Sequence, residues 1–149
     1  MAFSTNTGFY LKAIRFGNQD LVGSILDLSA GAPAQLEVIL STKAASVTGA
    51  AFLPDSDRPA SEVTVILIPQ EKERKENLAA YPKGATDDRG KFTIHDIPPG
   101  EYRAFAWDSV DNNIYMDTDF IRPLESKGVT VTLSEGSQAD INLILIAGH

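Results

Sequence analysis

Cysteine is absent from the 149-residue sequence, which excludes disulfide bonds and thiolate metal sites. Basic residues are in the minority, with 13 Lys and Arg against 20 Asp and Glu, and the net charge is -7. Nucleic acids and anionic membrane surfaces are bound by basic surfaces. The charge balance therefore argues against both kinds of partner.

Long hydrophobic runs are also missing, since none approaches the roughly 20 apolar residues that a membrane-spanning helix needs. We therefore predict no membrane insertion. The first residues, MAFSTNTGFYLK, contain no basic region followed by an apolar stretch, so we predict no signal peptide in this chain. What is present is typical of a globular domain, with 43% hydrophobic and 22% charged residues.

Short alternating or β-branched runs recur along the chain, separated by turn residues, and this spacing predicts an all-β sandwich or barrel. The single helical candidate, 70–80, is mostly charged and is interpreted as a solvated helix or loop. The expected strands are 9–16, 21–28, 35–41, 46–52, 62–68, 91–97, 101–107, 128–133 and 139–146.

The stretch ATDDRGKFTIHDIPPGEYRAFAW contains two turns, each followed by a strand. Gly90 lies where a hairpin needs a positive φ, and Pro99-Gly100 forms the second turn. Alternation then places Tyr102 on one face and Phe105 with Trp107 on the other. We expect Tyr102 to be buried, with its hydroxyl bonded to nearby backbone.

Four motifs in residues 46–146 resemble the carboxypeptidase regulatory-like domain of bacterial envelope and secreted proteins. They are Val47-Thr48-Gly49, Pro59-Ala60, Thr86-Asp87 with Gly90 and Phe92, and Pro99-Gly100 with Tyr102. The resemblance implies a seven-stranded, immunoglobulin-like (prealbumin-like) sandwich, grouped with starch-binding-like and Cna-B-like modules. It also implies an accessory or structural role beside other domains, and an extracellular or cell-envelope location.

The N-terminal third repeats a later part of the chain. LDLSAGAPAQLEVIL (26–40) aligns with VTLSEGSQADINLIL (131–145), and Gly8-Phe9-Tyr10 echoes Gly100-Glu101-Tyr102. We interpret 1–42 as the last strands of a preceding copy and 43–149 as the sandwich domain; two unrelated hairpins with similar turns are the alternative. The extra strands have edges that favour self-association.

Enzyme motifs are missing from the sequence. Ser24 lies in no GxSxG elbow, and the two histidines, His95 and His149, have no evident nucleophile to activate. A Cna-B-like Lys–Asn isopeptide bond would need a lysine on the first strand, where SVTGAAF has none, so Asn142 is read as an ordinary strand residue. We predict a protein without enzymatic activity or cofactor.

Two binding hypotheses stay open. Asp108, Asp111, Asp117 and Asp119 lie in one acidic loop and are weak calcium candidates, against a simple solvated loop. Phe105, Trp107 and Tyr115 would form a carbohydrate or protein site if their face is exposed. The same face is instead covered if residues 110–124, the N-terminal strands or a partner pack on it.

Overall fold

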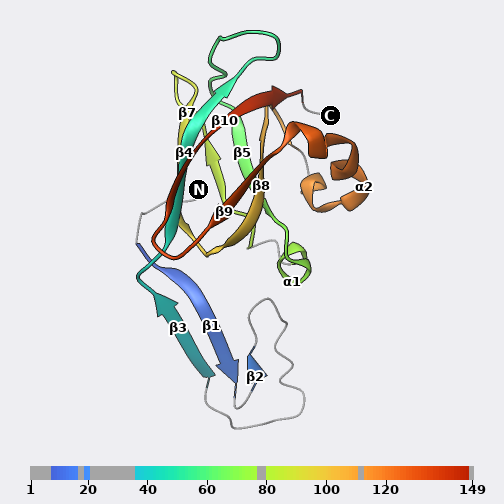
Figure 1. Cartoon of the computed structure of the whole chain (residues 1–149). Coiled ribbons are helices and arrows are strands. Elements are labelled where there is room, and N and C mark those ends of the chain that lie inside the picture. The colour runs from blue at the N-terminus through green and yellow to red at the C-terminus, as the bar shows by residue number, and fades with distance from the viewer. Residues whose placement is uncertain (1–7, 17–18, 21–35, 77–79, 111–112, 148–149) are drawn as a thin grey trace.

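The computed structural model describes residues 8–16, 19–20, 36–76, 80–110 and 113–147 (Figure 1). Its strands are β1 (Tyr10–Phe16), β2 (Gln19–Asp20), β3 (Leu36–Ser41), β4 (Ala45–Phe52), β5 (Thr64–Pro69), β6 (Lys83–Ala85), β7 (Lys91–Ile97), β8 (Gly100–Trp107), β9 (Val129–Leu133) and β10 (Gln138–Ile146). The helical segments are α1 (Lys72–Lys75), α2 (Thr118–Ile121), and the 3-10 turns η2 (Ile114–Met116) and η3 (Arg122–Lys127).

Strands β4 to β10 form the seven-stranded β-sandwich that the sequence predicts. The hydrogen-bonded order is β6-β5-β8-β10-β4-β7, and β9 pairs with β8. Strand β10 connects the two layers, because it runs parallel to β4 over 138–144 and then pairs with β8 at Leu145 and Ile146. The additional strands β1 to β3 form a separate sheet, so the predicted N-terminal extension is also present.

The main core lies between the two layers and is built from inward residues of β4, β5, β7, β8, β9 and β10. Alternation decides which residues enter it, since Phe92 and Ile94 are buried while Thr93 and His95 between and beside them are exposed. Gly49 allows β10 to approach β4 closely, because a Cβ there would lie 1.8 Å from the carbonyl oxygen of Ile141. The glycine of the Val-Thr-Gly motif is thus required by packing.

A second apolar cluster lies on the outer side of β5 and β8. Ile66, Ile68, Phe105 and Trp107 contribute to it from the strands. Residues of η2, α2 and η3 pack over them, with Tyr115 and Ile121 buried. Strands β5 and β8 are therefore covered on both faces, as their two-sided apolar sequence requires.

The N-terminal sheet, of order β2-β1-β3, projects from the end of the sandwich where β4 begins (Figure 1). Polar contacts attach it there. The Gly8 amide donates a 2.8 Å hydrogen bond to Asp96 Oδ1, and the Tyr10 hydroxyl donates one of 2.8 Å to Glu135 Oε1. Lys12 Nζ lies 3.4 Å from the same carboxylate. These contacts join the start of β1 to the end of β7 and to the loop between β9 and β10.

Several predicted elements differ from the structure. The helical candidate 70–80 is a single turn, α1, and β6 was not expected from the sequence. The expected strand 21–28 lies outside the described residues, as does half of the proposed repeat. None of the described helices is long and apolar enough to cross a membrane.

Candidate functional site

The three aromatic residues considered for binding are buried, so the hypothesis that they form an exposed binding face is wrong. Phe105 and Trp107 are each 1% exposed, and Tyr115 is 4% exposed. The first two rings stack with centroids 5.0 Å apart. Residues 113–127 cover this face. The face is therefore covered by the chain itself, which was one of the alternatives considered from the sequence. Within the described residues the Trp107 Nε1 is buried without a hydrogen-bond partner, an unfavourable feature that the packing of the ring must outweigh.

The threonine of the Thr86-Asp87 motif connects segments far apart in sequence. Its hydroxyl donates a 2.7 Å hydrogen bond to the Ala60 carbonyl and accepts one of 3.0 Å from the Val63 amide. Thr86 is 6% exposed, so these bonds satisfy backbone groups away from water. Thr86 therefore holds the 60–63 segment against the β7 hairpin.

Asp87 and Gly90 shape the hairpin turn that leads into β7. The Asp87 carboxylate accepts hydrogen bonds from the amides of Lys91 and Arg89, and these two bonds lower the pKa of that carboxyl. Gly90 has a φ of +72°, which confirms the expected positive φ. A Cβ at this position would also lie 2.7 Å from Pro59 Cβ. The Pro59-Ala60 and Thr86-Asp87 motifs therefore meet at one packed turn.

Tyr102 closes the opposite end of the sandwich, and both expectations for it are confirmed. Its ring is 1% exposed, and its hydroxyl donates a 2.7 Å hydrogen bond to the Pro98 carbonyl. Arg74 Nη1 donates to that hydroxyl and to the Pro99 carbonyl. Burial raises the pKa of Tyr102 to about 12. Gly100, with a φ of +155°, lies beneath the Arg74 guanidinium.

The described carboxylates of the acidic loop, those of Asp108, Asp117 and Asp119, do not form one site. Asp117 caps α2 by accepting a hydrogen bond from the Asp119 amide, and Asp119 pairs with Arg122 at 3.5 Å. Asp108 accepts from the Ser109 amide. Asp111 lies outside the described residues, and the rest of the described chain contains no group of three acidic, His or Cys side chains placed to hold a metal.

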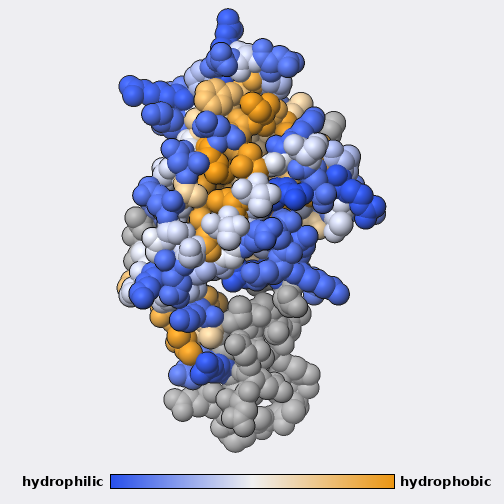
Figure 2. All heavy atoms as spheres, in the orientation of Figure 1, coloured by the Kyte–Doolittle hydropathy of each residue, from blue (hydrophilic) through white to orange (hydrophobic). Residues whose placement is uncertain are grey.

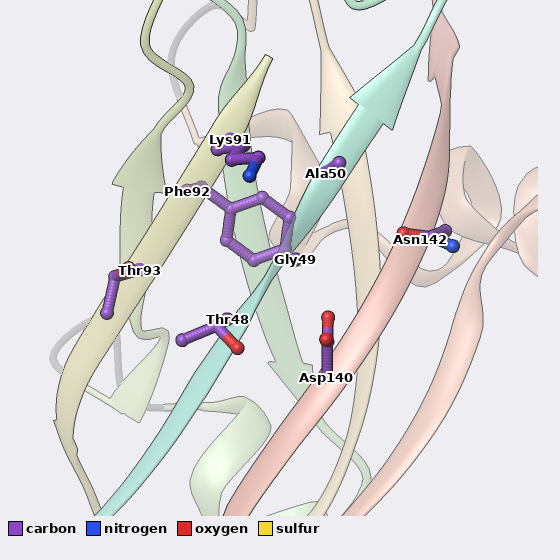
Figure 3. Close-up of a pocket in the computed structure, with 8 residues that line it drawn as sticks. All are labelled: Thr48, Gly49, Ala50, Lys91, Phe92, Thr93, Asp140 and Asn142. Carbon is purple, nitrogen blue, oxygen red and sulfur yellow. The ribbon is translucent and has the colours of Figure 1, made fainter. Parts of the chain in front are cut away.

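A shallow polar hollow of about 330 Å³ lies on the outer face of β4, β7 and β10 (Figure 3). Its floor is formed by the small residues of β4, including Gly49 and Ala50. Figure 3 shows Lys91 and Thr93 on β7 along one side, and Asp140 and Asn142 on β10 along the other. We call this feature the β4 groove. The groove was not predictable from the sequence, because its residues come from three strands that are distant in sequence.

The polar side chains of the β4 groove are not engaged with one another. Among the described residues, no hydrogen bond or ion pair joins Lys91 to Asp140 or Asn142 across the groove. A cation and a carboxylate on opposite walls leave the groove close to neutral. Such a lining can donate to and accept from a neutral polar ligand.

One of the remaining catalytic candidates, His95, lies among the described residues. His95 is exposed on β7, while Ser24 and His149 lie outside the described residues. Arg74 was missed by the sequence analysis, which treated its segment as one charged loop. Its role in bonding the Pro-Pro-Gly turn depends on a contact between residues about 25 positions apart.

Hydrophobic exposure is greatest on the N-terminal sheet. Figure 2 shows hydrophobic residues on its described part, in addition to the hydrophobic area in the middle of the sandwich, which hydrophilic side chains surround. Val38 is 54% exposed, Leu40 58% and Leu11 41%. Leu11 and Leu40 are paired across β1 and β3. We call Leu11, Val38 and Leu40 the N-terminal apolar patch.

Comparison with known proteins gives similarity of fold alone. No family model and no curated protein matches the chain. A DUF3823 family protein from Parabacteroides merdae is 17% identical, with a TM-score of 0.43, over 68% of this chain and 45% of that one. BcpA, the major pilin subunit of Bacillus cereus, is 13% identical, with a TM-score of 0.45, over 74% and 31% of the two chains.

A third similar structure is the Bacillus anthracis TIE protein, 11% identical with a TM-score of 0.41, over 74% of this chain and 19% of that one. The present chain thus spans less than half the length of each of these proteins.

Proposed function

We propose that this chain is a non-enzymatic, structural β-sandwich module of a cell-envelope or secreted protein, and that it makes protein–protein contacts through its N-terminal sheet. The observation that carries the proposal is the N-terminal apolar patch, held by polar contacts on a sandwich that already has its own core. Exposed apolar patches of this kind mark interaction sites.

The use of the motif residues supports a structural role. Thr86, Asp87, Gly90 and Tyr102, which carry the family resemblance, all bond or pack against backbone inside the sandwich. The aromatic residues of β8 fill the second apolar cluster. These residues serve the stability of the module.

Assays with ester, peptide and glycoside substrates test the non-enzymatic part of the proposal. We expect no turnover above background from the purified chain. The control is His95→Ala, which removes the exposed imidazole of β7 without disturbing the core. Turnover that survives repurification and disappears in this variant would overturn the proposal.

We further propose that residues 1–42 are the tail of a preceding copy of the domain. In the alignment, Val38 and Leu40 of β3 correspond to Leu143 and Leu145 of β10. Leu143 is 1% exposed and Leu145 packs on the core, whereas Val38 and Leu40 are exposed. The two segments correspond in sequence position but not in strand pairing. Strand β3 pairs antiparallel with β1, whereas β10 pairs parallel with β8.

Matched truncations at the equivalent positions test this division. Leu143→Ala should lower the free energy of unfolding by about 2–5 kcal/mol, because it opens a cavity in the core. Val38→Ala should change it by less than about 0.5 kcal/mol. Equal losses at both positions would show that β3 is covered within this chain and would contradict the division.

A second candidate function is weak binding of a saccharide in the β4 groove. The favouring observation is the polar, nearly neutral lining formed by Lys91, Asp140 and Asn142. A glycan array read beside the Asp140→Ala and Asn142→Ala variants tests it. Binding that both variants abolish would support the groove, and binding unaffected by them, or no binding, would exclude it.

A further inference from the structure

Strand β3 lies at the edge of the N-terminal sheet, so within the described strands only its β1 side is paired. An exposed edge presents unpaired N–H and C=O groups, and proteins normally block it with proline, charge, a bulge or short length. Strand β3 has six residues, LEVILS, with no proline and with Glu37 as its single charge. The irregularity in its pairing with β1 lies on the β1 side, between Leu11 and Ala13.

Two edges of the sandwich, β6 and β7, are blocked in ways that β3 is not. Strand β6 has only three residues, and its Lys83 lies over the Tyr115 ring, 4.6 Å from the centroid. Strand β7 carries an exposed Lys91 and His95, and Asp96 near its end has a φ of +58° that departs from extended geometry. Strand β3 therefore stands out among these edges as the one open to pairing.

The side chains of β3 favour the same conclusion. Val38 and Leu40 are both more than half exposed, and they alternate with Glu37, Ile39 and Ser41 along the strand. Alternation places Val38 and Leu40 on one face of the sheet, beside Leu11 of β1. An added strand that presents aliphatic residues at the same positions would bury the flanks of both.

We propose that β3 pairs antiparallel with β3 of a second copy of this chain, about a two-fold axis through Ile39. This inference rests on the proposed function of the N-terminal sheet as a contact element. In this register Val38 lies opposite Leu40 of the second copy, and Glu37 lies opposite Ser41, so no like charges meet. A two-fold axis gives each copy the same contacts, and closed two-fold dimers are the commonest oligomers.

The register is specific because side chains alternate along a strand. Symmetric pairing about a residue places even-numbered positions opposite even-numbered ones, so the apolar faces of the two copies join into one surface. Pairing centred between two residues would instead place Val38 opposite an odd-numbered residue of the second copy, such as Glu37 or Ile39, which belongs to the other face of its strand. The joined sheet would contain β3 of both copies at its centre and leave β2 at each outer end.

Light scattering after size-exclusion chromatography of the full 149-residue chain tests the dimer. We expect a mass twice the 16.1 kDa of the chain at high concentration, falling toward one chain on dilution. The Leu40→Lys variant should raise the dissociation constant at least about tenfold, because it places a charge in the pairing surface. The near-ultraviolet circular dichroism of buried Trp107 reports whether the sandwich stays folded in each variant.

The matched control is Ile144→Lys. Ile144 is 51% exposed, close to the exposure of Leu40, but its strand β10 pairs with β4 at this residue and with β8 at the next two residues. This variant should keep the dissociation constant of the unaltered chain. Dissociation of the dimer by both variants would indicate general hydrophobic association and would overturn the pairing.

Hydrogen exchange at two concentrations locates the contact. Amides of β3 should exchange at least about tenfold more slowly in the dimer than in the dilute chain, while those of β7 should not change. A chain that is monomeric up to about 1 mM would overturn the dimer and leave an upstream sandwich as the occupant of this edge. The hydrolase assays test the non-enzymatic function separately, so the two failures are distinguishable.

Discussion

The hydroxyl of Thr86 donates a 2.7 Å hydrogen bond to the carbonyl oxygen of Ala60, joining the β6–β7 connection to the segment that precedes β5. The same oxygen accepts the Val63 amide, and the Thr86 amide donates to the Val63 carbonyl at 3.0 Å. One buried side chain thus satisfies the Ala60 carbonyl and the Val63 amide, which lie between the Phe52–Pro59 bridge and the start of β5.

Replacement of Thr86 by valine should destabilise the protein by about 2–3 kcal/mol, because the Val63 amide and the Ala60 carbonyl would each lose a partner while buried. Denaturant unfolding measures the change. Thr86→Ser keeps the hydroxyl and should lose less than half as much. Equal losses in the two variants would mean that the methyl group, and not the hydrogen bonds, matters at this position.

Gly90 and Gly136 provide a matched pair for backbone strain. Their φ values are +72° and +70°, but a Cβ at Gly90 would meet Pro59 and the Ala51 carbonyl, whereas at Gly136 nothing lies within 4 Å. Alanine at Gly136 should cost about 1 kcal/mol from φ alone. Valine at Gly90 should cost on the order of 2 kcal/mol or more, because a steric clash is added. If thermal unfolding shows equal costs, the packing around Gly90 is looser than described.

Tyr102→Phe should lower the free energy of unfolding by about 1–2 kcal/mol, because the Pro98 carbonyl and the Arg74 guanidinium both lose a hydrogen-bond partner. Tyr115→Phe is the control, because its hydroxyl bonds only the Asn113 side chain among the described residues. That change should cost less. Unchanged stability of Tyr102→Phe would contradict the corner hydrogen bond.

The same tyrosine should make stability depend on alkaline pH. The pKa of Tyr102 is about 12 in the folded protein, above its ordinary value of 10.0, so the folded state keeps its proton to higher pH than the unfolded state. The resulting contribution is complete below pH 10 and is lost as the pH rises through that interval. Between pH 10 and 12 the free energy of unfolding should fall less steeply with pH for Tyr102→Phe than for the unaltered chain. Equal slopes would contradict the raised pKa of Tyr102.

Acid should loosen the attachment of the N-terminal sheet. The hydrogen bond from the Tyr10 hydroxyl, together with the Lys12 charge, lowers the pKa of Glu135 below its ordinary value of 4.5. A lowered folded pKa gives a stabilisation that is present above the ordinary value and is lost as the pH falls through the folded pKa. The hydrogen-exchange protection factors of β1 amides, which correct for the slower intrinsic exchange in acid, should fall as the pH falls in the native chain. In Glu135→Gln that fall should be smaller, and an equal fall would count against this contact.

The strands and their faces were predictable because alternation carries the information locally. Tyr102 after a Pro-Pro-Gly turn and Phe92 beside Gly90 identify both the turns and the inward face. Strand β6 was not predictable, since three residues, KGA, show no alternation and owe their pairing to β5.

The candidate sites were less predictable because they depend on what packs over a strand. Trp107 looks the same in sequence whether its face is open or covered, and the covering segments η2, α2 and η3 are too short to show helical periodicity. The β4 groove depends on the order β7-β4-β10, which brings Lys91 and Asp140 to opposite walls of one groove only in the folded sheet.

The central claim is that the sandwich is complete by itself and that the N-terminal sheet is an appended contact element. Thermal unfolding of a chain starting at Lys43, measured by near-ultraviolet circular dichroism beside the full chain, tests it most directly. We predict a cooperative transition with a native Trp107 signal, at most a few degrees below that of the full chain because the contacts of Tyr10 and Gly8 are lost. A shortened chain without a cooperative transition would show that the N-terminal strands are integral to one larger sandwich.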